Sequence, residues 1–339
     1  MKRRIGIVLV LALLLSSCAV TPPGQTKYTA SFLTLFDTVT SIVGYADSEM
    51  EFQETAQKIH DELLTYHQLF DIYKDYEGIN NLKTINDQAG IAPVAVDPAI
   101  IRLLLDCRDY YDLTDGMVNP AMGSVLRLWH DSRNAGLDDP ASASLPDADE
   151  LEQAAAHIDF DCIVIDEAAS TVFLTDAGMS LDVGAIAKGW ATQRVAENAP
   201  AGLLISVGGN VCATGPKTTG GDPWIVGIQN PDGGENLHTI YVTAGAVVTS
   251  GDYQRVYYVD GKPYHHIIDP ATRMPGTYWR SVSVVCVDSG LADALSTALF
   301  LLPLEQGQAL AARCGAEVFW VDQAGDEFMT PGFGEMIRT

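Results

Sequence analysis

An aspartate and a threonine share one face of a predicted helix near the end of the chain. Asp293 and Thr297 lie four residues apart in the apolar segment 290–302, so a helix places both side chains on the same side. A carboxylate in such a segment needs a partner. A carboxylate and a hydroxyl are hard oxygen ligands suited to Mg²⁺, with substrate phosphates completing the coordination shell. The alternative is a helix whose aspartate caps or pairs with a buried base.

The second candidate site is a predicted helix start at residues 181–190. Here an apolar strand ends at Asp182, Gly184 turns the chain and a helix begins. Backbone N–H groups at a helix start favour an anion. Lys188 adds a positive charge of the kind that binds phosphate. A packing turn with a surface lysine would give the same pattern.

Two further motifs follow in the second half of the chain. Small hydroxyls beside a glycine in Thr249–Tyr253 suit an anionic ligand, and the downstream pair His265-His266 offers a candidate base near neutral pH. The alternative is two strand histidines, one facing in and one facing out, without a role. No third nitrogen or sulfur ligand has fitting spacing, which disfavours a transition metal. The pair Gly208-Gly209 allows either close approach of a ligand or a bulge.

The composition limits the classes of function. The chain has 339 residues, 20 Lys and Arg, 44 Asp and Glu and a net charge of −24, with 47 % apolar residues. That apolar content can build a sizeable core, which excludes wholesale disorder. The acidity argues against nucleic acid as a partner, because phosphate backbones require clustered cations. The sequence lacks the glycine-rich dinucleotide and phosphate-loop motifs, the zinc-protease motif and the hydrolase elbow.

Hydrophobic spacing predicts the elements that position these motifs. We expect strands in 29–45, a helix over 49–70, and a helix after Asp97-Pro98, with Asp97 as its N-cap. Residues 131–150 are polar and predict a surface loop, whose acidic cluster at 147–152 is a solvated helix start. Further helices are expected at 185–198 and 290–302, and Asp260-Gly261 predicts a hairpin between the strand at 253–259 and a second strand at 263–268, which would contain His265 and His266. The remaining predicted strands are 161–165, 171–175, 203–213, 224–229, 238–249, 253–259 and 281–287. These elements do not alternate as regular βαβ units, so the expected fold class is α+β, with a largely antiparallel sheet packed with helices.

The N-terminus has the features of an export signal. Three cations at positions 2–4 precede the apolar run 5–15, and a Leu-Ser-Ser-Cys sequence follows. That ending resembles a bacterial lipobox, in which Cys18 becomes the lipidated first residue. An ordinary signal peptide with a chance cysteine is the alternative.

The expected organisation follows from this signal. Residues 1–17 are a lipoprotein signal peptide, 18–28 a tether and 29–339 a single domain. Removing the signal takes the net charge from −24 to −27, because three cations are lost. The mature protein would be extracytoplasmic and anchored to the bacterial cell membrane by lipid. The five other cysteines have no pairing signal, so we expect free thiols.

The motifs occur in the order and spacing of the FAD:protein FMN transferases, the ApbE family, which the chain resembles over roughly residues 30–325. The matching segments are 182–189, 207–210, 249–253, 266–272 and 292–298. The resemblance implies a T-fold-like architecture and a Mg²⁺-dependent enzyme. Such an enzyme transfers FMN from FAD to a Thr or Ser hydroxyl of an acceptor flavoprotein and releases AMP.

The resemblance also implies roles for individual residues. His266 would be the catalytic base, and Asp293 and Thr297 would bind Mg²⁺ together with the backbone carbonyl of Ala185. The implied FAD contacts are Phe36, Tyr73, Asn119, Pro120, Ala121, Asp182, Lys188 and Ile267.

Three segments depart from the family pattern. Phe36-Asp37-Thr38 stands where the family often has Met-Gly-Thr, and Asn119–Ala121 replaces a triplet that begins with an acid. Arg273 stands in place of a glycine after Asp269-Pro270. Two other functions use the same residues: hydrolysis of FAD to FMN and AMP, and flavin binding without catalysis. Neither involves nucleic acid.

Overall fold

The structure, a computed structural model, describes residues 25–339. The lipidation site predicted at Cys18 therefore lies outside the described residues. Within residues 25–339, no helix combines the length and the hydropathy that a membrane span requires. The cysteines at 107, 162, 212, 286 and 314 are all free, as the sequence predicts.

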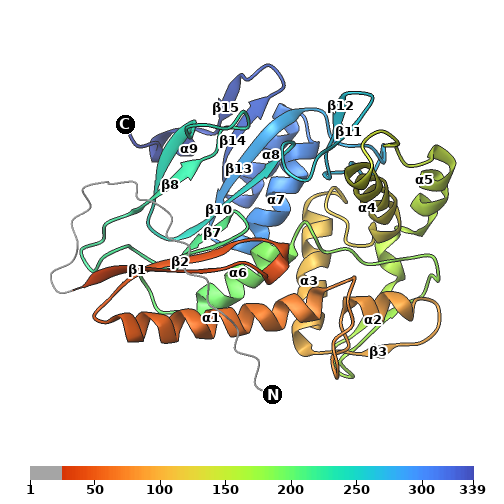
Figure 1. Cartoon of the computed structure of the whole chain (residues 1–339), viewed down its shortest axis with the longest axis horizontal. Helices are drawn as coiled ribbons and strands as arrows, with labels where there is room; N and C mark the ends of the chain where they lie inside the picture. The colour runs from red at the N-terminus through yellow and green to blue at the C-terminus, as the bar shows by residue number, and fades with distance from the viewer. Residues whose placement is uncertain (1–24) are drawn as a thin grey trace.

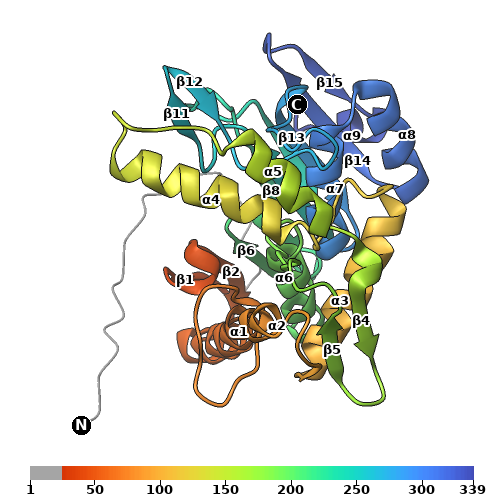
Figure 2. The same cartoon turned by 90° about the vertical axis from the view of Figure 1, so that its right-hand side faces the viewer.

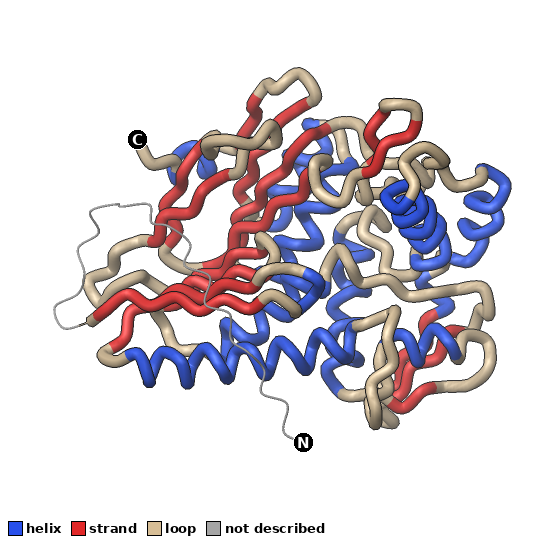
Figure 3. Tube along the Cα trace, in the orientation of Figure 1, coloured by secondary structure: helices blue, strands red, loops and turns tan. Residues whose placement is uncertain are grey.

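An eight-stranded antiparallel sheet is the centre of the fold (Figures 1 and 3). Its strands, in spatial order, are β1 (Thr26–Phe32), β2 (Thr40–Ala46), β6 (Leu203–Val207), β7 (Asn210–Ala213), β10 (Gly245–Gly251), β13 (Trp279–Cys286), β14 (Glu317–Asp322) and β15 (Glu327–Met329). The spatial order follows the chain order, and residues 47–202 form an insertion between neighbours β2 and β6. The α+β class with a largely antiparallel sheet is confirmed.

Both faces of this sheet are covered. On one face, Val282 and Val284 of β13 join a core with Leu295 and Leu299 of α7 (Ser289–Leu301). On the other face, Val285 packs with a hairpin formed by β8 (Trp224–Ile228) and β9 (His238–Val242), and with α9 (Pro331–Met336). Residues 281–286 of β13 are all buried, which explains why the valines at 282, 284 and 285 do not follow the strict alternation of a strand with one exposed face.

The remaining helices cover the edges of the sheet and build a second region (Figure 2). Helix α1 (Glu49–Phe70) lies under β1 and β2, and α8 (Leu304–Cys314) follows α7. The insertion contains α2 (Leu82–Asp87), α3 (Pro98–Leu113), α4 (Gly123–Asp138), α5 (Ala148–Ala154), α6 (Ala187–Asn198) and a small sheet of β3 (Val94–Ala95), β5 (Thr171–Leu174) and β4 (Ile163–Asp166). A separate hairpin of β11 (Tyr257–Val259) and β12 (Lys262–Tyr264) packs on α4.

Several sequence predictions are confirmed, and their caps explain why. Ser48 accepts a hydrogen bond from the backbone N–H of Glu51 at the start of α1, and Asp97 caps α3. Asp147 caps α5, so the acidic cluster is a helix start. Asp260 and Gly261 adopt the left-handed conformation that the β11–β12 turn requires.

The prediction of a surface loop over 131–150 is wrong, because α4 continues to Asp138. Its polar residues form the exposed side of a helix whose other side packs in a core with Val125 and Trp129. Gly136 allows the approach: a Cβ there would lie 2.9 Å from the Tyr257 ring. Only residues 139–147 connect α4 to α5.

Three predicted strands are interrupted at left-handed residues. The stretch 203–213 is a hairpin that turns at Gly208 and Gly209, and 238–249 divides before Gly245. Arg255, with φ 47°, shortens the strand predicted at 253–259 to β11. The close approach at Gly208 is to Thr38, whose Cγ2 would lie 2.7 Å from an added Cβ.

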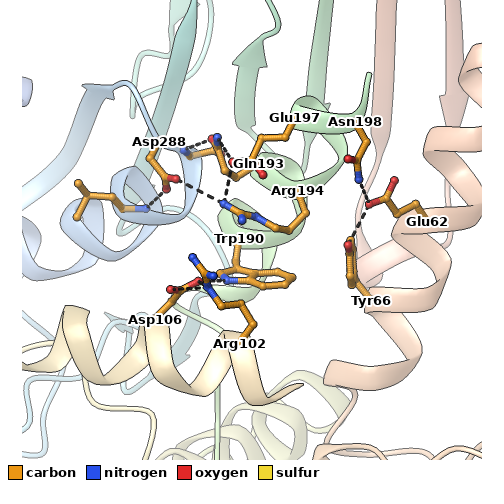
Figure 4. Close-up of polar contacts among 12 residues, drawn as sticks. Glu62, Tyr66, Arg102, Asp106, Trp190, Gln193, Arg194, Glu197, Asn198 and Asp288 are labelled. Atoms are coloured by element: carbon orange, nitrogen blue, oxygen red, sulfur yellow. Dashed lines mark hydrogen bonds and ion pairs between the residues drawn. The ribbon is translucent and has the colours of Figure 1, made fainter. Parts of the chain in front are cut away.

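A polar network around Trp190 fixes α6 between its neighbours (Figure 4). The Trp190 Nε1–H donates to Asp106 Oδ2 of α3 at 2.7 Å, and Arg194 lies over the Trp190 ring. Gln193 Oε1 accepts from the N–H of Ser289, the first residue of α7. The network therefore fixes the position of the start of α6 relative to α3 and α7.

We expect Trp190→Phe to lower the free energy of unfolding by about 1–3 kcal/mol, because it removes a hydrogen bond to a largely buried carboxylate. Arg102→Ala is the matched control. It removes an i,i+4 ion pair with the same Asp106, but the Arg102 side chain is 62 % exposed, so its loss should cost only about 0.3–0.5 kcal/mol. Urea unfolding of both variants measures the difference, and equal losses would contradict the anchoring role of Trp190.

Candidate active site

The start of α6 places a lysine beside a buried carboxylate of α7. Asp182 Oδ1 accepts from the N–H of Gly184 at 2.8 Å and shapes the turn before the helix. Lys188 follows one turn later, and its Nζ lies 3.3 Å from the Gly184 carbonyl oxygen. The N–H of Gly189 donates to Asp293 Oδ2 at 2.8 Å. The two helices that the sequence predicts as separate motifs therefore meet at one site.

The Asp293 side chain is held in an unfavourable environment for an anion. The residue is only 5 % exposed. Burial raises the pKa of Asp293, whereas the positive charge of Lys188 and the Gly189 N–H oppose the shift. A buried carboxylate with few partners is a group that a bound cation would stabilise.

Glycine at position 189 is required by the helix contact. A Cβ there would lie 2.3 Å from the Ser289 carbonyl oxygen and 2.4 Å from Asp293 Cβ.

We expect Gly189→Ala to cost about 1–3 kcal/mol of stability, because the backbone must move. Gly220→Ala is the control, since its nearest neighbour would lie at 3.4 Å, and it should change stability by less than about 0.5 kcal/mol. Thermal unfolding compares them, and a wild-type midpoint for Gly189→Ala would rule out the tight contact.

The residues around Asp293 fit a magnesium ion that is shared with a substrate. Thr297 lies one turn further along α7 and is half-buried, as is Ala185 in the turn before α6. Within the part of the chain that the structure describes, no group of three or more His, Cys, Asp or Glu side chains could hold a metal. One carboxylate, a hydroxyl and a carbonyl suit Mg²⁺ when phosphate oxygens supply the other ligands.

The segment 119–121 lies against the turn before α6. The Asp182 N–H donates to the Pro120 carbonyl at 2.8 Å, and Gly123 bonds Ser180 in the same way. The Asn119 side chain bonds the N–H of Ala121 and the carbonyl of Ile158, while the side chains of Pro120 and Ala121 are buried. The segment is thus next to the site, but its side chains hold the chain in place and present no free polar group.

The two aromatic residues predicted near the N-terminus take different positions. Tyr73 is 61 % exposed, and its hydroxyl lies 2.7 Å from His130 Nδ1. Desolvation of the hydroxyl, together with the nearby charge of Asp182, raises the pKa of Tyr73 to about 12. Phe36 is half-buried, has φ 52° and packs edge-on against His67. Tyr73 therefore reaches the Asp182 side of the site, and Phe36 lies in the loop between β1 and β2.

His266 presents one ring nitrogen as a base. Its Nδ1 lies 3.1 Å from the Gln254 carbonyl oxygen, which can only accept, so Nδ1 carries the proton and Nε2 has the lone pair. Burial, together with the charge of Arg255, lowers the pKa of His266 to about 3. The imidazole is therefore neutral at physiological pH. Ile267, the next predicted contact, is buried, and its carbonyl accepts from Gly276.

The expected strand placement of the two histidines is wrong, because β12 ends at Tyr264. His265 and His266 follow the strand and line the same small cavity. His265 Nε2 donates to the Gly276 carbonyl at 2.9 Å, and its Nδ1 accepts from Ile267. Both ring nitrogens of His265 are occupied, so it holds the loop in place.

The sequence of this chain matches a known family model over residues 36–320, described as the ApbE family. A FAD:protein FMN transferase from Treponema pallidum is 38 % identical over 250 residues, which cover 68 % of this chain and 67 % of that protein. One from Klebsiella pneumoniae is 32 % identical over 264 residues, covering 74 % and 79 %. The chain belongs to the ApbE family. The crystal structure of the ApbE protein from Thermotoga maritima agrees, with a TM-score of 0.82, 28 % identity and coverage of 93 % of this chain and all of that one.

Two departures from the ApbE pattern keep the backbone that glycine would adopt. Asp37 and Arg273, which stand where the family often has glycine, have φ of 52° and 61°. The Asp269 side chain accepts from the N–H groups of Ala271 and Thr272, and the Asp269 carbonyl accepts from Arg273, which supports the turn. Both residues therefore adopt the left-handed conformation that glycine favours.

The hydroxyls of Thr249 and Ser250 have structural partners in this ApbE chain. Thr249 bonds Ser283 of β13 at 2.7 Å, and Ser250 bonds Ser296 of α7 at 2.8 Å. They tie β10 to its neighbours. Sequence reasoning missed the cavity residues His130, Arg133 and Arg255. The available signal was the spacing of Trp129 and Arg133 on one helix, which was hidden because residues 131–150 were predicted to form a loop.

Proposed function

We propose that this chain transfers FMN from FAD to a Thr or Ser hydroxyl of an acceptor protein in a Mg²⁺-dependent reaction that releases AMP. The observation that carries the proposal is the buried carboxylate of Asp293, bonded to Gly189 and adjacent to Lys188. The relatives are FAD:protein FMN transferases, and this indicates the reaction class. The site contains a carboxylate and a lysine, which such a reaction needs. FAD carries a pyrophosphate, so a cationic binding site is required in a protein of charge −24.

The residues divide the work between binding and proton transfer. Lys188 and the N–H groups at the start of α6 would bind and orient the pyrophosphate. Asp293, Thr297 and the Ala185 carbonyl would hold Mg²⁺, which neutralises charge on phosphate oxygens when bound. Attack on a phosphoric anhydride depends mainly on such positioning and charge neutralisation.

His266 would accept the proton of the incoming hydroxyl at Nε2. The acceptor oxygen forms a bond to the phosphorus of the FMN half, and the bond from that phosphorus to the bridging oxygen breaks. AMP leaves with the bridging oxygen. The Gln254 carbonyl fixes the tautomer that leaves Nε2 free, and Nδ1–H keeps that hydrogen bond as the ring becomes positive.

Incubation with FAD, Mg²⁺ and an extracellular flavoprotein subunit that has a Thr or Ser acceptor tests the proposal. We expect the acceptor to gain the mass of one FMN and AMP to appear in equal amount. AMP without a mass gain would indicate FAD hydrolysis instead. Retention of FAD without AMP would indicate a flavin-binding protein, and both results would contradict the proposal.

We further propose that Cys18 is the lipidated first residue of the mature protein, on the basis of the Leu-Ser-Ser-Cys sequence. Two or more acyl chains give stable membrane anchoring, which one chain does not. Cys18→Ala should therefore move the protein out of the membrane fraction or leave it unprocessed. Cell fractionation with mass measurement tests this, and unchanged partitioning and size would refute it.

A further inference from the structure

Two arginines beside His266 have no anionic partner of their own. In residues 25–339, the arginines that form ion pairs are Arg102, Arg108, Arg194, Arg280 and Arg313. Arg133 and Arg255 are absent from that set. Arg133 Nη1 is buried and has no hydrogen-bond partner among the described residues. A buried guanidinium nitrogen normally has a hydrogen-bond partner, so Arg133 Nη1 is available to a ligand.

The two guanidinium groups are close enough to repel one another. Burial lowers the pKa of Arg133, and the charge of Arg255 lowers it further. Arg255 acts in the same way on His266. The chain has more than twice as many acidic as basic residues, yet no carboxylate forms an ion pair with either arginine among the residues described. Such an arrangement costs stability in the free protein and favours an anion between the arginines.

The shape of the site restricts what that anion can be. Arg133, Arg255 and His266 line one small cavity of about 10 Å³, together with the Trp129 ring. This space accommodates about one water-sized group, such as one oxygen of a carboxylate at its rim, and it is far too small for a flavin or adenine ring. Lys188 does not line the cavity, although its charge acts on His266. The cavity therefore does not include the lysine of the proposed pyrophosphate site.

One of the two arginines lies at the solvent side of the cavity. Arg255 is exposed, and it precedes the β11–β12 hairpin that packs on α4, the helix of Arg133 (Figures 1 and 2). A hydroxyl that reaches His266 Nε2 brings its own flanking chain across this rim. A single guanidinium group can bind a carboxylate with two parallel hydrogen bonds, and a second arginine adds further donors and positive charge.

We propose that Arg133 and Arg255 bind an acidic side chain of the acceptor segment, close in sequence to the Thr or Ser that receives FMN. This inference rests on the proposed function, because it assumes an acceptor polypeptide. It makes the pair a specificity determinant: an Asp or Glu near the hydroxyl fills the cavity rim and places that hydroxyl at His266.

The test uses a pooled library of nine-residue peptides with a central Thr and with Asp, Asn or Lys scanned through the flanking positions. Binding to the immobilised protein without FAD is read by mass spectrometry of the retained peptides. With FAD and Mg²⁺, transfer is read as the added mass of FMN. We expect at least about tenfold enrichment of some Asp peptides over their Asn twins, since a hydrogen bond to a charged group contributes about 1.5–3 kcal/mol.

Arg133→Gln and Arg255→Gln should each abolish that enrichment, and Arg127→Gln should keep it. Arg127 is the matched control because it lies on the same helix, is exposed and does not line the cavity. Arg133→Gln should also raise the melting temperature of the free protein, because repulsion is relieved.

Three outcomes overturn the inference. The first is no enrichment by the wild type, and the second is enrichment that survives in both variants. The third is a fall in FAD affinity as large as the loss of enrichment, which would assign the arginines to the nucleotide. Enrichment without FMN transfer would contradict the proposed function and leave the acidic-peptide site standing, so the two failures are distinguishable.

Discussion

Replacing Asp293 with asparagine should lower FMN transfer by at least about 10³-fold and leave the magnesium-free protein at least as stable as the wild type. The loss of rate follows because metal neutralisation of phosphate charge contributes several kcal/mol, and each 1.36 kcal/mol is a factor of ten. The expected stability of the variant follows from the burial of the Asp293 side chain. The carboxylate is 5 % exposed and its pKa is raised, so its ionised form is costly, whereas an amide oxygen still accepts from Gly189.

Transfer assays over a range of Mg²⁺ concentrations and thermal unfolding without metal measure the two effects. Thr297→Ala is the comparison. It removes a neutral ligand from the same helix face, so it should raise the Mg²⁺ requirement and lower the rate less. Wild-type turnover by Asp293→Asn at low Mg²⁺ would show that the metal is held elsewhere.

His266→Ala should reduce transfer by about 10²–10⁴-fold while FAD affinity changes little. In the proposed mechanism the base acts on the acceptor hydroxyl in the transition state, whereas Lys188 and the start of α6 would hold FAD. His265→Ala should instead lower stability, because both ring nitrogens of His265 are bonded inside the protein. FAD titration, transfer rates and unfolding midpoints of both variants separate these roles, and a His266 defect confined to FAD binding would reject the base assignment.

The depressed pKa of His266 also sets its pH dependence. The folded pKa is about 3 and the ordinary value is 6.5, so Nε2 remains available down to about pH 4. Transfer should therefore show no acid limb near pH 6.5 from this group. Because the folded pKa is depressed, neutral His266 contributes stability above pH 6.5, and that contribution is lost as the pH falls toward 3.

Site residues that lie close together in the sequence could be predicted. Contacts between residues far apart in the sequence could not, because only the tertiary fold brings them together. Gly184 and Lys188 mark a helix start in a short stretch of sequence, and Asp293 and Thr297 mark a helix face. The hydrogen bond from Gly189 to Asp293 joins these motifs, but nothing in either segment encodes that distance.

The errors have the same origin. The residues after Trp129 were predicted as a loop because a helix that packs on only one side needs few apolar residues. In addition, a glycine at position 136 does not indicate the close contact with Tyr257. His265 looked like an interchangeable neighbour of His266 because its partners Gly276 and Phe300 come from later elements, and only the fold brings them to the histidine ring. The fold class was easier to predict, since strand length and glycine turns are local properties.

The insertion between β2 and β6 has a consequence for how the chain folds. Thr40 pairs with Val207, so the N-terminal hairpin cannot join the sheet until the whole of residues 47–202 has been synthesised and its ends have met. Loop closure grows only slowly in cost with length, about 0.6 kcal/mol per doubling, but pairing over such a separation is slow. Until then β2 has an open edge that includes Ile42 and Val43, and open strand edges pair with other chains. The β1–β2 hairpin is therefore synthesised first but joins the sheet late. During synthesis, α1 is the nearest element that can shield this hairpin.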